Sequence, residues 1–142
     1  MNRTDAWLLH ISNGLVTLTG LVYAWMAYFA QSDDPYTVVG HPWQPHVQHA
    51  HIWVAPLFVL VIGHLWNSHI QPHLAGGTLK RRTSGIGMLV AALPMIFSGY
   101  FIQTAVEQHW RTIWVVVHLV VSLFWIVGYL IHITHKLTAK RF

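Results

Sequence analysis

The chain contains no cysteine among its 142 residues. This absence excludes disulfides, zinc sites with thiolate ligands, iron–sulfur clusters and haem attached covalently through a C-x-x-C-H motif. Any metal ion that the protein binds must therefore have nitrogen or oxygen ligands.

Charged residues are also scarce. Asp, Glu, Lys and Arg make up 8% of the chain, against about a quarter in an average soluble domain, and hydrophobic residues make up 54%. This composition predicts an integral membrane protein, and eight Trp residues suit a chain with aromatic side chains at the headgroup level. The length allows a single domain, 1–142. No internal repeat or low-complexity linker is evident.

Four apolar runs are long enough to cross about 30 Å of hydrocarbon, which takes about 20 helical residues. They are 6–30, 47–66, 84–103 and 112–135. The connections between them are short, so the sequence predicts an all-α, up-down bundle of four membrane helices. Pro56 and Pro94 lie inside two of the runs and are expected to kink the helices without breaking them. The first run is too long for the apolar part of a signal peptide, and we expect it to be retained.

Lys and Arg are distributed unequally around these runs. With alternating spans, only Arg111 falls on one side, whereas the other side holds Arg3, Lys80, Arg81, Arg82, Lys136, Lys140 and Arg141. The positive-inside rule then predicts that both termini and the 67–83 connection are cytoplasmic and that the 31–46 loop faces outward. This rule also accounts for the net charge of +4, so we do not expect nucleic acid as a partner.

The twelve histidines are the most unusual feature of the composition. Under this topology His10 and His132 lie about one turn inside the cytoplasmic face, whereas His51 and His118 lie near the outer face. Ionisable residues inside membrane spans are rare and usually functional, because a polar group without a partner in hydrocarbon costs several kcal/mol. The histidines of the spans thus define two levels.

The last run gives the sharpest signal. His118 and His132 are fourteen residues apart, which returns to within about 40° of the same direction on an α-helix and separates them by roughly 21 Å. This spacing leaves room for two stacked macrocycles in a bundle. Haem iron in electron-transfer sites is commonly held by two imidazoles, and bundles build such sites from side chains on facing helices. Each level then needs one further histidine.

For the outer level the expected partner is His51, with His49 as its alternative. For the inner level there are two candidates, His10 and His64. Thirteen residues separate His51 from His64, about 220° of helical rotation, so helical phase favours His10. Two glycines on the same helix faces, Gly14 and Gly128, lie four residues from His10 and His132, where a missing side chain would let a flat porphyrin approach.

This pattern resembles the four-helix di-haem cytochrome b membrane subunits of formate dehydrogenase and nickel–iron hydrogenase, and related bacterial cytochromes b. In that family the ligands come from the first helix, the outer end of the second and two positions on the fourth, which match His10, His51, His118 and His132 here. The resemblance covers all four runs. It implies two non-covalent b haems in a bacterial inner membrane, exchange of electrons with menaquinone or ubiquinone, and a redox partner such as a cytochrome or an iron–sulfur protein. The chain is short and rich in further histidines, which departs from the family.

Other polar residues have expected roles at the faces of the membrane. Candidates for a quinone site are His64, Asn67, Tyr100, Gln103 and Glu107. Candidates for contacts with haem propionates are Arg111, His109 and Trp43 on the outside, and Lys136, Arg81 and Arg82 on the inside. The closely spaced His41, His46 and His49 could chelate a metal ion, although contacts with propionates or an interface are favoured. Simple solvation is the expected state of His69, His73, His109 and His135.

Two other classes of protein are weighed against the cytochrome. A membrane di-iron enzyme gathers its histidines on one side and needs carboxylates to bridge the irons, and the spans contain no such bridging carboxylates. A metal or proton transporter needs a continuous polar path, often through discontinuous helices, which four uninterrupted runs do not offer.

Overall fold

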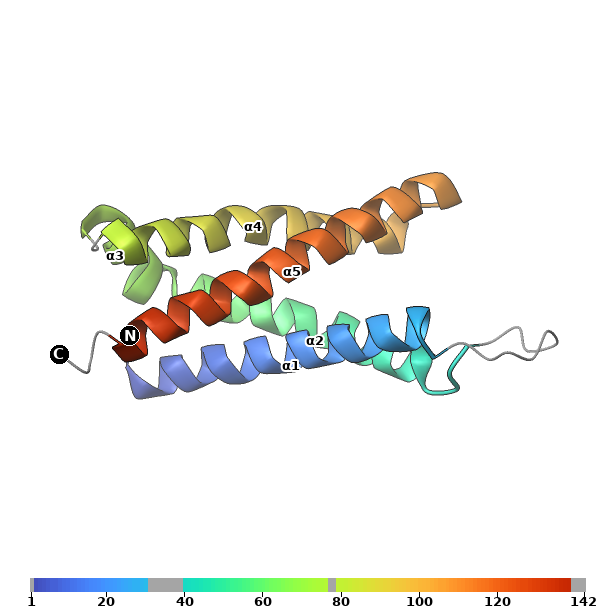
Figure 1. Cartoon of the computed structure of the whole chain (residues 1–142), viewed down its shortest axis with the longest axis horizontal. Coiled ribbons are helices and arrows are strands. Elements are labelled where there is room, and N and C mark those ends of the chain that lie inside the picture. The colour runs from blue at the N-terminus through green and yellow to red at the C-terminus, as the bar shows by residue number, and fades with distance from the viewer. Residues whose placement is uncertain (1, 31–39, 77–78, 139–142) are drawn as a thin grey trace. The chain divides into compact units, whose positions relative to one another are not determined.

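The computed structural model describes residues 2–30, 40–76 and 79–138, with side chains for all of them except 79–82 and 135–138. These residues form five α-helices and one π-helical turn, and no strand occurs among them. The elements are α1 Arg3–Tyr28, α2 Gln44–His64, η1 Trp66–Ile70, α3 Gln71–Gly76, α4 Leu79–Thr104 and α5 Gln108–Thr138 (Figure 1). The all-helical fold expected from the sequence is confirmed.

A capping box starts α1 earlier than expected. The Asn2 side chain accepts a hydrogen bond of 2.7 Å from the Asp5 backbone N–H, and the Asp5 carboxylate accepts one of 3.4 Å from the Asn2 backbone N–H. These bonds satisfy backbone donors that have no partner inside the helix. The helix therefore begins at Arg3, ahead of the apolar run itself.

The prolines of the spans do not end their helices. Pro56 lies inside α2 and Pro94 inside α4, and both helices continue through them. After α2, the backbone forms the π-helical turn η1 and then the short helix α3, where the sequence suggested a plain connection. The connection from α4 to α5 is three residues, shorter than the eight expected, because α5 already starts at Gln108.

The helices pair into two compact units, residues 1–71 and 72–142. In the first unit α1 packs along α2, and in the second α4 packs along α5, so each unit is built on an antiparallel helical hairpin (Figure 1). The expectation of one domain over 1–142 stays a prediction.

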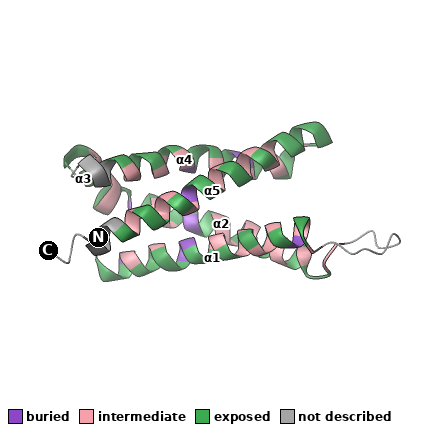
Figure 2. Cartoon of the chain, viewed as in Figure 1, coloured by how far each residue is buried: buried purple, intermediate pink, exposed green. Residues whose placement is uncertain are grey.

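Four of the helices, α1, α2, α4 and α5, are long and apolar enough to cross a membrane. Many of their large apolar side chains are exposed, and exposed residues occur along each of these helices in Figure 2. Trp53 is 78% exposed and Phe124 is 69% exposed, although both are in the middle of apolar helices. Water would oppose such exposure, whereas lipid would not. These features suggest a multi-pass membrane protein.

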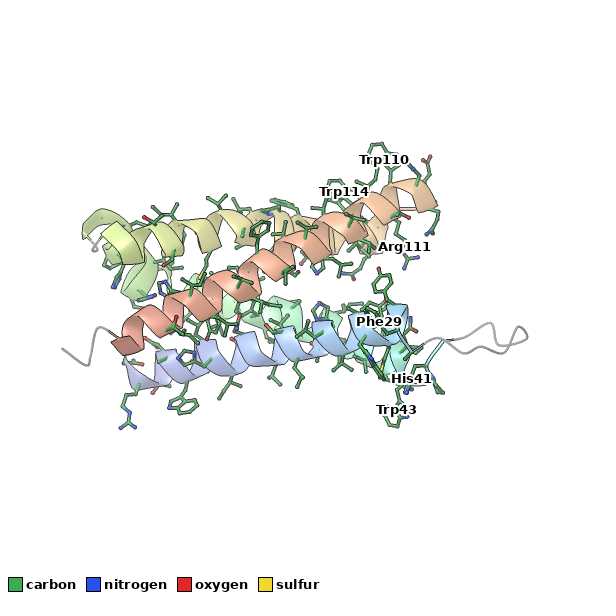
Figure 3. All side chains as sticks on the ribbon, viewed as in Figure 1. Phe29, His41, Trp43, Trp110, Arg111 and Trp114 are labelled. Atoms are coloured by element: carbon green, nitrogen blue, oxygen red, sulfur yellow. The ribbon has the colours of Figure 1, made fainter. Side chains whose placement is uncertain are left out.

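Aromatic residues gather where each hairpin turns. Figure 3 shows Phe29, His41 and Trp43 near the end of α1 and the start of α2, and Trp110, Arg111 and Trp114 on the first turns of α5. In the second hairpin, Phe101 stacks on Trp114 with ring centroids 4.5 Å apart. Such clusters are typical of the boundary between lipid and water.

Several residues with expected roles lie outside the described part of the chain. They are the 31–39 part of the loop expected to face outward, Lys140 and Arg141, and the side chains of Lys80, Arg81, Arg82, His135 and Lys136.

Candidate functional site

The ring of His51 on α2 is held by a hydroxyl of α1. Its Nδ1 lies 3.1 Å from Thr19 Oγ1, and the Thr19 hydroxyl lies 2.8 Å from the carbonyl oxygen of Leu15 in the preceding turn. A hydroxyl has one proton, so Thr19 can donate it either to the Leu15 carbonyl or to Nδ1 of His51. When the Leu15 carbonyl receives it, the Thr19 oxygen accepts from Nδ1–H, and the lone pair of the neutral ring is on Nε2.

Gly20 lies directly beside that ring. A Cβ atom placed on Gly20 would be 3.0 Å from Cε1 of His51, closer than side chains normally approach. The absent side chain therefore lets the imidazole lie against the backbone of α1.

His118 on α5 has an equivalent support on α4. Its Nδ1 is 3.1 Å from Ser98 Oγ and 3.1 Å from the carbonyl oxygen of Met95. The Ser98 hydroxyl donates to the same carbonyl at 3.1 Å, and Ser98 is completely buried. A carbonyl can only accept, so Nδ1 of His118 has the proton and Nε2 has the lone pair. Gly99 follows Ser98, and a Cβ there would be 3.5 Å from Cε1 of His118.

His132, fourteen residues further along α5, meets the other end of α4. Its Nδ1 is 2.9 Å from Ser84 Oγ, and Gly85 follows that serine with an added Cβ 4.0 Å from Cε1 of the ring. The two serines are fourteen residues apart on α4, the same separation as the two histidines on α5. The antiparallel hairpin thus aligns both pairs.

Three histidines therefore share one local arrangement, which we call the hydroxyl–glycine support. In each, the imidazole Nδ1 contacts the hydroxyl of a Ser-Gly or Thr-Gly dipeptide on the preceding long helix, namely Thr19-Gly20 with His51, Ser98-Gly99 with His118, and Ser84-Gly85 with His132. Sequence reasoning found the histidines but missed these dipeptides. The signal was the fourteen-residue recurrence of Ser-Gly in one span and of His in the next.

The two glycines that the sequence suggested for contact with a porphyrin differ in surroundings from the glycines of the hydroxyl–glycine supports. A Cβ on Gly14 would have nothing within 4 Å, and a Cβ on Gly128 would meet Cγ of Met88 on α4 at 3.4 Å. Neither glycine contacts an imidazole in this way. Their proposed role beside a porphyrin stays a prediction.

The remaining ligand candidates are in the first hairpin. His10 is exposed on α1, and His49 is exposed near the start of α2. His64, the last residue of α2, is paired with Asp5 through Nε2 and Oδ1 at 3.4 Å; its side chain is 63% exposed, whereas that of Asp5 is 11% exposed. On a straight helix His51 and His64 would differ by about 220° in direction, yet the rings of both contact α1.

The candidates for a quinone site fall at two hairpin ends. Asn67 is exposed in η1, close in sequence to His64. Tyr100, Gln103 and Glu107 are exposed around the end of α4, and the Gln103 amide donates to the Gly99 carbonyl at 3.1 Å. Tyr100 and Gln103 thus lie within about two turns of the support for His118 on the same helix.

The outer histidines do not form a chelate. Among the residues that the structure describes, no three His, Asp or Glu side chains gather as a metal site, so His41, His46 and His49 do not come together. Nδ1 of His41 accepts from the Trp43 backbone N–H at 3.2 Å, and the ring of His46 lies 5.7 Å from that of Trp43. His109 lies against Trp110 at 6.1 Å, and Arg111 is exposed.

Comparison of the chain with family models, with curated proteins and with solved structures found no match.

Proposed function

We propose that the chain is a membrane cytochrome b subunit that holds two non-covalent haems and passes electrons between a quinone pool and a redox partner protein. The observation that supports this most strongly is the pair of histidines on α5. His118 and His132 are fourteen residues apart on one helix, and each contacts a serine of α4 through Nδ1.

The residues fit a haem iron chemically. The nitrogen of a neutral imidazole that binds a metal needs a lone pair, and the other nitrogen usually donates to a nearby acceptor that fixes the ring. His118 has this tautomer, with Nδ1 donating to the Met95 carbonyl. The contact with Thr19 is compatible with the same tautomer of His51. When bound, haem supplies one-electron chemistry.

The chain's own contribution is to hold the rings and to set their basicity. The hydroxyls of Thr19, Ser84 and Ser98 orient the imidazoles, and the carbonyl of Met95 adds a second acceptor for His118. An acceptor on Nδ1–H makes the ligand nitrogen more basic and so favours the oxidised iron.

The pairing of ligands rests on depth in the membrane, as inferred from the sequence. His51 and His118 belong to the outer level and His132 to the inner level, where the first hairpin supplies the fourth ligand, His10 or His64. Arg111, His109 and Trp43 would contact propionates outside, and Lys136 with Arg81 or Arg82 would do so inside.

The rest of the proposal follows from the family resemblance. The protein would be a subunit of an oxidoreductase complex in a bacterial inner membrane, with a cytochrome or iron–sulfur protein as partner. Menaquinone or ubiquinone would bind near His64 and Asn67, or near Tyr100, Gln103 and Glu107. These exposed polar groups can donate hydrogen bonds to a quinone or exchange protons with its reduced form.

A pyridine haemochrome spectrum of the purified protein tests this function. We expect about two haems b per chain, because bis-imidazole ligation of two irons needs the four proposed histidines. The matched control is His73→Leu on α3, outside the spans, which should retain both haems. Purified protein that contains non-haem iron, or no haem after supplementation of the growth medium with a haem precursor, would contradict the proposal.

A further inference from the structure

The two hairpins repeat one arrangement of polar residues. A shift of 79 residues superimposes three small or polar positions of α1 on those of α4, namely Asp5 on Ser84, Thr19 on Ser98 and Gly20 on Gly99. The same shift brings Ala6, a small residue, onto Gly85. The correspondence is hard to detect in the sequence, because the residues around these positions are apolar in both spans.

The second helices continue the correspondence. α2 has His51 and His64 thirteen residues apart, and α5 has His118 and His132 fourteen residues apart. The contacts across each hairpin match in order: Thr19 with His51 and Asp5 with His64 in the first, and Ser98 with His118 and Ser84 with His132 in the second. Each hairpin therefore presents two histidines to two polar side chains of its first helix.

His10 has no place in this repeat. The shift of 79 residues brings it onto Leu89 of α4, an apolar residue. His10 lies on a first helix, whereas the three histidines with hydroxyl–glycine supports all lie on second helices.

The helical phase that favoured His10 assumes a straight α2. Pro56 lies between His51 and His64, and a proline inside a helix can rotate the turns that follow it. In the structure both rings contact α1, so the expected divergence of about 220° does not turn His64 away from the partner helix.

Resting on the proposed haem function, we propose that His64 is the fourth axial ligand, equivalent to His132, and that Asp5 is its positioning residue. Asp5 is buried and its backbone is fixed by the capping box with Asn2, so its carboxylate is held at the start of α1. A carboxylate that accepts from the second nitrogen of a metal-bound imidazole is a common way to orient the ring.

The nitrogen that faces Asp5 differs from that of the other three histidines. His64 presents Nε2 to the carboxylate at 3.4 Å, at the long limit of a hydrogen bond. Its side chain is 63% exposed at the end of α2, so the ring can rotate about its side-chain bonds with little displacement of neighbouring residues. With iron on Nε2, the N–H that remains for Asp5 is Nδ1, as in the other three.

Single substitutions test the assignment through haem content. We expect His64→Leu to retain one haem b per chain of the two in the wild type, with the same midpoint potential for the remaining haem as in His132→Leu. His10→Leu, which removes the competing candidate on α1, should retain two haems with unchanged potentials. A wild-type protein without haem would refute this proposal together with the proposed function. Two haems in His64→Leu with one in His10→Leu would overturn this proposal alone.

Two further variants keep the test valid if His64→Leu does not fold. His64→Met should retain both haems and raise the potential of one, because a thioether in place of imidazole favours the reduced iron. Asp5→Asn should also retain both haems and raise the potential of that same haem, because the amide is a weaker acceptor than the carboxylate. Unchanged potentials in both variants, or loss only of quinone turnover in His64→Met, would place His64 outside the iron's ligands.

Discussion

A hydroxyl group on a helix has a single proton, and the destination of that proton decides what its neighbour can donate or accept. Thr19 and Ser98 each direct theirs to a backbone carbonyl of the preceding turn. Their oxygens can then accept from Nδ1 of His51 and of His118. For His118 the Met95 carbonyl, which can only accept, fixes the proton on Nδ1 and the lone pair on Nε2. A carbonyl of one helix thus selects the tautomer of a ring on the next.

The serine of α4 that contacts His132 should affect a bound haem. In Ser84→Ala, His132 loses the contact of 2.9 Å between its Nδ1 and the serine hydroxyl. We therefore expect the variant to contain two haems, with a higher midpoint potential for one of them, because the ligand nitrogen becomes less basic. Redox titration of purified protein measures this shift. Ser84→Thr, which retains a hydroxyl, should restore the wild-type potential; an unchanged potential in Ser84→Ala would contradict the expectation.

Gly20 should tolerate even a methyl group poorly. In Gly20→Ala the new Cβ would be 3.0 Å from Cε1 of His51, so the ring must move and its bond to Thr19 must lengthen. Gly87→Ala is the matched control, since nothing lies within 4 Å of its Cβ, and alanine there should stabilise the helix by up to about 1 kcal/mol. We expect haem content per chain, and the melting temperature in detergent, to fall in Gly20→Ala only. A similar decrease in both variants would indicate a general cost of alanine in these helices.

At the scale of the elements, the sequence predicted what depends on length, hydrophobicity and periodicity. The four long helices and their continuation through Pro56 and Pro94 follow from the apolar runs. The apolar runs did not predict where the helices begin and end, because α1 begins at a capping box and the π-helical turn η1 depends on local backbone hydrogen bonds. The supports for the imidazoles were missed because they require the register of one helix against the next. That register appears only when Ser84 and Ser98 are compared with His132 and His118.

The separation of the two histidines on α5 predicts that replacing either one removes a different haem. His118 and His132 lie on one continuous helix about 21 Å apart and contact different serines, so under the proposed function they would bind different haems. We expect His118→Leu and His132→Leu each to remove one b-type haem and to leave the other. The residual midpoint potentials of the two variants should differ. Loss of the same spectral component in both variants, or unchanged haem content, would refute two separate levels.

At the scale of the whole molecule, the distribution of charge predicts an orientation. Every Lys and Arg except Arg111 falls on the side of the termini and of the 67–83 connection when the four long helices alternate across the membrane. A basic residue is retained on the cytoplasmic side during insertion, so the turn between α4 and α5 should face outward. The same orientation would set which of the two proposed haems is the outer one.

The absence of cysteine makes this orientation directly measurable. Val106 between α4 and α5 is 98% exposed, and Ala75 on α3 is exposed, so Val106→Cys and Ala75→Cys each add a single reactive thiol to a chain that has none. We expect a membrane-impermeant maleimide to label Val106→Cys in intact cells, and Ala75→Cys only after the membrane is permeabilised or inverted. The wild-type chain is the control and should remain unlabelled in every condition. Labelling of Ala75→Cys in intact cells, with protection of Val106→Cys, would invert the topology and place His132 with His64 at the outer face.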